Sequence, residues 1–214
     1  MRTSVIIDKN FNLYLLSKYR TQLMGVSALM IILCHALHYG VEVSGLLRKF
    51  LVFLNIGVDI FLFLSGMGCY FSLTKSHGYF SWLKKRFIRI FIPYTIVLLT
   101  LRMSGILVDH ASWSEWLLYY STLRFWTHHD GMWFVALLVL LYPLAPFIYQ
   151  ILNNSRRRAL TAVMLIILCL AITHISIIDT VDMVTSVMAN LKGAFKHTVS
   201  FIIGMYIALM LRKT

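Results

Sequence analysis

Apolar stretches of about twenty residues alternate with short polar or basic connections along this chain of 214 residues. The hydrocarbon core of a bilayer is about 30 Å thick, so one helical crossing needs roughly 20 apolar residues. The stretches that meet this requirement are approximately residues 19–40, 50–73, 90–108, 131–152, 158–176 and 195–211. The pattern predicts an all-α, polytopic membrane helix bundle with about six transmembrane helices, forming a single domain over residues 1–214.

The composition changes this picture little, but the charge distribution adds an orientation. Hydrophobic residues make up 59% of the chain and charged residues 13%, which is more apolar than a soluble domain. The net charge of +12 fits a nucleic-acid partner in principle. If the chain crosses the membrane six times, however, fourteen of its twenty lysines and arginines fall on one side of the membrane. The positive-inside rule therefore predicts a protein of the plasma (inner) membrane with both termini cytoplasmic, and no nucleic-acid partner.

The beginning of the chain does not have the features of a cleaved signal peptide. Residues 1–17 lack an uninterrupted apolar run and a small-residue cleavage site, because Asp8, Lys9 and Asn10 interrupt them. We therefore expect the first span to remain as an anchor.

The first span carries a polar stripe that a lipid-facing helix would not need. At about 100° per residue, one face of this helix collects Arg20, Ser27, Cys34, His35 and His38. Ionisable groups are costly at membrane depth and are by default candidates for function. The stripe predicts that this helix lines a polar interior.

His35 is the residue of the stripe best suited to chemistry. A neutral imidazole accepts a proton from a hydroxyl near pH 7, which makes histidine the usual general base. In the second span Asn55 and Asp59 share a face, at depths of about 9 Å and about 15 Å. Asn55 is nearer to His35 in depth, and either residue can orient the ring if the two spans pack together. The alternative is a histidine that is hydrogen-bonded to a neighbouring helix only for packing.

The three cysteines, Cys34, Cys69 and Cys169, lie inside spans and show no metal-ligand spacing. We expect no metal site and no disulfide framework. Cys34 beside His35 is open to two interpretations, a nucleophile or a small packing residue, and the second is favoured.

Two connections are candidates for binding substrates. The basic connection 75–90 contains Lys84, Lys85, Arg86 and Arg89, which suit either interfacial anchoring or the docking of a phosphorylated cytoplasmic molecule. The aromatic connection 109–131 suits an interfacial aromatic belt or the stacking of sugar rings. Its residues that can receive an acceptor are Trp126, His128, His129 and Asp130.

Four stretches of the chain, in order, resemble the acyltransferase-3 family of membrane acyltransferases. These are GVSALMIILCHA (25–36), IGVDIFLFLSGMG (56–68), KKRFIRIFIPYTI (84–96) and MWFVALLVLLYPLAPFIY (132–149). The resemblance implies transfer of an acyl group, commonly acetyl, from cytoplasmic acyl-CoA to hydroxyls of cell-envelope or exported glycans, without a bound cofactor. It also implies that His35 is catalytic.

This chain departs from the pattern of the family at two points. The family arginine lies eleven positions before the histidine, where this chain has Met24; Arg20 is one helical turn earlier on the same face and can substitute for it. Ser65 and Gly66 match the family's SG pair, for which we expect a role in close helix approach. The chain also has fewer spans than such proteins usually have, so it resembles a member shortened at the C-terminus.

Together these observations predict that acyl-CoA docks near Arg20 and the 84–89 cluster, and that its thioester extends toward His35. His35 then deprotonates the acceptor hydroxyl or briefly carries the acyl group itself. The expected partners are acyl-CoA, a glycan or glycolipid acceptor and the bilayer, and a second copy of the chain is a further candidate. The alternatives are a truncated inactive relative, a transporter of acylated or sugar compounds, and a lipid-binding scaffold.

Overall fold

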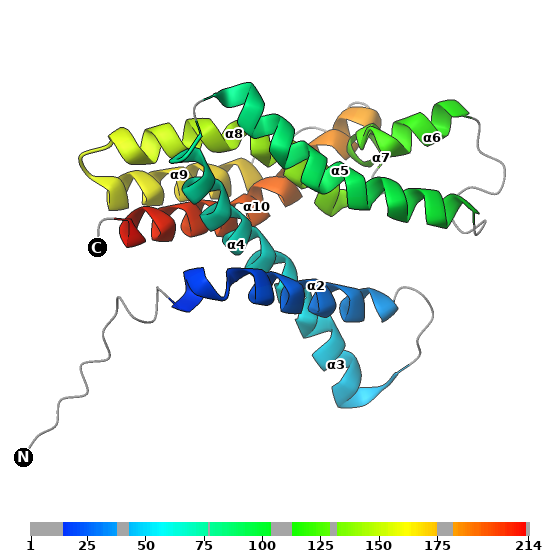
Figure 1. Cartoon of the computed structure of the whole chain (residues 1–214). Coiled ribbons are helices and arrows are strands. Elements are labelled where there is room, and N and C mark those ends of the chain that lie inside the picture. The colour runs from blue at the N-terminus through cyan, green and yellow to red at the C-terminus, as the bar shows by residue number, and fades with distance from the viewer. Residues whose placement is uncertain are drawn as a thin grey trace, which may run out of the picture.

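The computed structural model describes residues 15–37, 43–76, 78–103, 113–128, 132–174 and 182–212, without the side chains of 101–102 and 182–185. Within these residues the chain is helical and forms no strand, so the all-α prediction is confirmed (Figure 1). The helices are α2 (Arg20–Ala36), α3 (Gly45–Phe53), η2 (Leu54–Ile56, a 3₁₀ helix), α4 (Gly57–Leu73), α5 (Tyr79–Met103), α6 (Trp113–Tyr120), α7 (Leu123–His128), α8 (Trp133–Asn154), α9 (Arg158–Thr173) and α10 (Asp182–Leu211).

Three helical segments of the described chain are long and apolar enough to cross a membrane: Gly45–Leu73, Trp133–Asn154 and Ser186–Leu211. Arg20–Ala36 and Arg158–Thr173 are apolar but shorter. The chain is thus a membrane protein, while the six spans and the cytoplasmic termini remain predictions.

The basic cluster lies inside a helix and not in a connection. Helix α5 begins at Tyr79, eleven residues before the expected start of the third span, so it includes Lys84 to Arg89. A helix places residues three and four apart on one face. Arg86 and Arg89 therefore share a face and line one cavity; Arg86 is half-buried, whereas Arg89, like Lys84 and Lys85, is exposed.

The centre of the fold is the packing of α4 against α10, and α2 crosses α4 on another side. Figure 1 shows α8, α9 and α10 side by side and α2 set apart from them. The core between α4 and α10 is fully buried and includes Leu62, Met67, Phe201 and Met205. Between membrane helices, close van der Waals packing of such side chains is the main favourable contribution, because lipid tails are as apolar as the side chains themselves.

Two glycines allow this close approach. A Cβ on Gly66 would clash with the backbone carbonyl oxygen of Phe201, and a Cβ on Gly204 would clash with that of Phe63. Small residues let membrane helices approach at backbone distance. The expected role of Gly66 in close helix approach is confirmed.

Apolar side chains cover the outer faces of α2 and α9. Val26, Leu29 and Ile32 on α2 are exposed, as are Val163 and Ile167 on α9. Exposed apolar faces of this extent are typical of helices surrounded by lipid.

Candidate functional site

A cavity of about 580 Å³ lies between α2, α4, α5 and α8 and is lined by three arginines. Arg20 comes from α2, and Arg86 and Arg89 come from α5. No acidic side chain lines it among the described residues. We call it the arginine cavity, and its positive charge is available to a bound anion.

Arg86 is held in place from several sides. Its Nη2 donates a hydrogen bond of 2.6 Å to the carbonyl oxygen of Gly68, and a second, short one to the hydroxyl of Ser72. Its guanidinium lies 5.4 Å from the ring centre of Trp82 and 5.9 Å from that of Tyr142. These contacts fix its plane, which favours recognition of a phosphate by a planar pair of donors.

Arg20 depends on a glycine for its position. Its guanidinium lies so close to Gly68 that any Cβ there would collide with Nη1. Arg20 and Arg86 therefore meet around the same turn of α4, although they come from helices on either side of it. The sequence analysis expected Arg20 and the 84–89 cluster to act at one docking site, and in the structure Arg20 and Arg86 line the same cavity.

A second cavity, of about 570 Å³, is lined by His35 at the other end of α2 and by the start of α8. The imidazole Nδ1 lies 2.8 Å from the carbonyl oxygen of Ile31. Because a carbonyl oxygen only accepts, Nδ1 is the donor and the neutral ring has its lone pair on Nε2. We call this space the His35 cavity; its histidine is in the tautomer required of a base acting through Nε2.

The arginine cavity and the His35 cavity adjoin. Met132, Phe134 and Val135 line both of them. A long, flexible molecule anchored at the arginines can therefore extend along the start of α8 toward His35.

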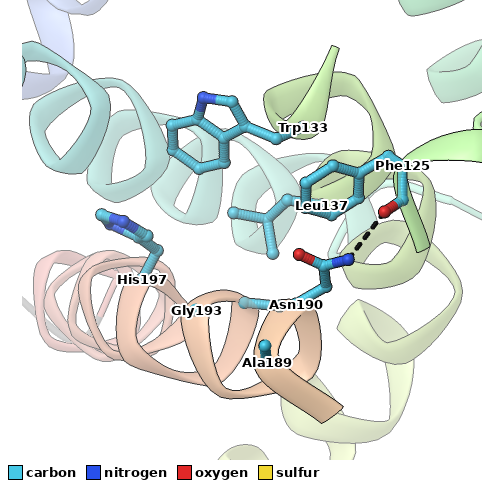
Figure 2. A pocket seen from close by; sticks show the side chains of 8 residues that line it. Phe125, Trp133, Leu137, Ala189, Asn190, Gly193 and His197 are labelled. Atoms are coloured by element: carbon cyan, nitrogen blue, oxygen red, sulfur yellow. Dashed lines mark hydrogen bonds between the residues drawn. The ribbon is translucent and has the colours of Figure 1, made fainter. Parts of the chain in front are cut away.

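A third cavity, of about 280 Å³, lies between α7, α8 and α10 and is lined by His197 (Figure 2). Trp133 lines both this cavity and the His35 cavity. Its ring centre is 5.2 Å from that of His197, with 36° between the planes. We call this space the His197 cavity.

His197 is oriented by Asp59. Its Nδ1 lies 3.0 Å from Oδ1 of Asp59, and the Ser200 hydroxyl donates to the same oxygen at 2.9 Å. In this pairing the imidazole Nδ1–H donates to the carboxylate, so Nε2 is the accepting nitrogen of the neutral ring. Sequence reasoning assigned Asp59 or Asn55 to His35, whereas the hydrogen bonds of Asp59 go to His197 and Ser200.

Other expected site residues lie away from these three cavities. Asn55 is exposed in η2 and lines none of them, and the exposed His128 has Nδ1 2.7 Å from the Thr127 hydroxyl. Trp126 packs against the core, and its carbonyl oxygen accepts a hydrogen bond from Asn190. His129 and Asp130 lie outside the described residues.

Sequence reasoning missed His197 and Tyr142, and it gave Ser65 only a role in close helix approach. The signal for His197 was present, since it is an ionisable residue within the last apolar stretch. Ser65 and Tyr142 line the arginine cavity, and their hydroxyl oxygens are 3.2 Å apart. In sequence they are 77 residues apart, so nothing local signalled that pair.

Comparison with known proteins gives a family. The family model described as an acyltransferase domain matches residues 22–214, which is most of the chain. Searches of the curated proteins and of the solved structures each found no match. The match includes His35, Arg86, Arg89 and the His197–Asp59 pair.

Proposed function

Because this chain belongs to the acyltransferase-3 family and is a membrane acyltransferase, we propose that it moves an acetyl group from acetyl-CoA to a hydroxyl of a cell-envelope or exported glycan. The observation that carries this proposal is the contact between the arginine cavity and the His35 cavity. The arginine cavity offers positive charge, which a phosphorylated acyl donor requires. The His35 cavity offers a base, which a hydroxyl acceptor requires.

The arginine cavity suits the donor. Coenzyme A carries phosphates, and guanidinium groups bind phosphate through paired, charge-assisted hydrogen bonds. Arg20, Arg86 and Arg89 supply three such groups. In our proposal they hold the phosphates at the cytoplasmic side of the plasma (inner) membrane, and the pantetheine arm extends past Val135.

His35 then acts as the general base. Its Nε2 takes the proton of the acceptor hydroxyl, and the hydroxyl oxygen attacks the thioester carbonyl carbon. The C–O bond forms, the C–S bond breaks, and the proton passes from His35 to the departing thiolate. The Nδ1 hydrogen bond to Ile31 keeps the required lone pair on Nε2 of the neutral ring before the proton transfer.

The test is transfer of radiolabelled acetyl from acetyl-CoA to envelope glycan, in membranes containing the full chain. We expect His35→Gln to lower the rate by about 10²–10⁴-fold, the usual contribution of a general base. The matched control is His174→Gln, since His174 is exposed at the end of α9. Equal rates for His35→Gln and His174→Gln would remove His35 from the mechanism.

The donor site is tested in the same membranes. Arg86→Gln should raise the KM for acetyl-CoA about tenfold or more, whereas Arg156→Gln, at an exposed position outside the cavity, should not. Absence of transfer by the wild type, despite stable insertion and glycan from the same cells, would contradict the proposed function.

A further inference from the structure

We propose that the His197 cavity is the acceptor site and that it holds one sugar ring. This inference rests on the proposed function for the acceptor class, and it adds the location, the size and the residues of the site. The cavity lies beside the reaction centre, because Trp133 is a shared wall between it and the His35 cavity.

The size of the cavity argues for a single ring. Its volume is about 280 Å³, just below the roughly 300–1,000 Å³ of small-molecule sites. A longer stretch of glycan does not fit inside it. A glycan would therefore present one residue, with the rest of the chain outside.

The lining combines aromatic faces with small residues, as a sugar ring requires. Trp133 and Phe125 provide aromatic surfaces, and Gly193 leaves space on the facing side of α10 (Figure 2). The C–H groups of a sugar carry partial positive charge and pack against the negative face of an aromatic ring. The wall is held together because the Asn190 amide donates to the Phe125 carbonyl oxygen at 2.6 Å.

His197 supplies the polar contact. Asp59 engages Nδ1, and among the described residues the structure shows no hydrogen-bond partner for Nε2. Nε2 can thus accept a hydrogen bond from a sugar hydroxyl, while a second hydroxyl of the same ring is directed past Trp133 to His35. In this arrangement His197 is a positioning residue, and the Asp59 carboxylate fixes its tautomer and orientation.

The first test measures binding without any donor. Tritiated methyl glycosides of glucose, galactose, mannose and N-acetylglucosamine are the probes, with the full chain in detergent on scintillation proximity beads. Gly193→Leu should fill the cavity and weaken binding about tenfold or more, because a Cβ at Gly193 meets no atom within 4 Å and the side chain enters open space. Gly25→Leu is the matched control, since Gly25 is equally open on α2 and lines none of the three cavities.

Each result decides the inference. Binding of at least one glycoside by the wild type and by Gly25→Leu, with loss in Gly193→Leu, supports it. Failure of the wild type to bind any of the four, or equal binding by both glycine variants, overturns it. The assay contains no acetyl-CoA, so its failure is distinguishable from failure of the proposed acetyl transfer.

The second test separates positioning from folding. With acetyl-CoA saturating, His197→Leu should raise the KM for the bound glycoside about tenfold, with a smaller change in kcat. His197→Gln keeps a hydrogen-bond acceptor and should restore part of the loss. A fall in kcat alone, or no difference between the leucine and glutamine variants, would contradict the assigned role of His197.

Discussion

Oδ1 of Asp59 on α4 and Nδ1 of His197 on α10 are joined by a hydrogen bond of 3.0 Å, although the two residues are 138 positions apart in the sequence. The pair joins the two central helices of the bundle, and His197 lines the cavity that Trp133 separates from His35. The carboxylate of Asp59 thus orients His197 on α10, whereas the histidine of the family motif is His35 on α2.

The first prediction concerns the proton on His197. Because the carboxylate accepts, the neutral ring should have its proton on Nδ1, and Asp59→Asn should allow a larger share of the Nε2–H tautomer. Nitrogen-15 NMR of histidine-labelled protein measures this, with the signal assigned by its loss in His197→Gln. A dominant Nε2–H signal in the wild type would contradict the hydrogen bond as described.

The second prediction concerns Gly68 and the donor site. A methyl group at Gly68 collides with the flexible end of Arg20, so Gly68→Ala should displace the guanidinium and leave the helices in place. We expect the KM for acetyl-CoA to rise about tenfold with little change in kcat. Steady-state acetyl transfer measures this effect.

The control for Gly68→Ala is Gly25→Ala, which adds a methyl group in open space. The double variant Gly68→Ala with Arg20→Gln should be no worse than Arg20→Gln alone, because both changes remove the same contact. Additive losses would mean that Gly68 affects the donor site by another route.

The third prediction concerns helix packing. The methyl group of Gly204→Ala has to displace the backbone of α4 at Phe63, and overpacking of this kind costs about 1–3 kcal/mol. Gly193→Ala in the same helix meets no neighbour and should be neutral or slightly stabilising, since alanine favours a helix over glycine. Thermal unfolding in detergent compares the two, and equal midpoints would disprove the close approach of α4 and α10 at Gly204.

The fourth prediction concerns Ser72, which connects α4 to α5. Its hydroxyl accepts hydrogen bonds from Trp82 Nε1, at 2.6 Å, and from Arg86, and it donates to the carbonyl oxygen of Cys69 at 3.0 Å. Ser72→Ala leaves the Trp82 and Arg86 donors without this acceptor, which should cost about 1–3 kcal/mol. Unfolding by denaturant measures this loss of stability, and Ser81→Ala, at an exposed position of α5, is the control. Equal stability of the two variants would argue against the role of Ser72 in connecting α4 to α5.

Local sequence was sufficient for several features of the site. The stripe on α2 predicted that Arg20 and His35 line a polar interior; both line cavities, although apart from His35 the His35 cavity is lined by apolar and aromatic side chains. The helical spacing of Arg86 and Arg89 puts them on one face, and both line the arginine cavity. These features follow from the period of the helix, which depends only on neighbours in the chain.

Asn55 shows where the helical period failed. Asn55 lies four residues before Asp59, so in a continuous α-helix the two side chains would share a face. The structure instead has the 3₁₀ helix Leu54–Ile56 at this point, with about three residues per turn, which changes the direction of the side chains before α4. Asn55 is therefore exposed.

By itself the sequence determined the all-α class, the helix faces that carry Arg20, His35, Arg86 and Arg89, and the role of the glycine at position 66, because hydrophobicity, periodicity and residue size are properties of a local segment. The tertiary structure alone decided that Asp59 pairs with His197 and that Trp133 separates two cavities. Those relationships depend on which helices pack together and at what rotation. That choice comes from the summed fit of many side chains and from close contacts such as Gly204 against Phe63, which no single stretch of the chain contains.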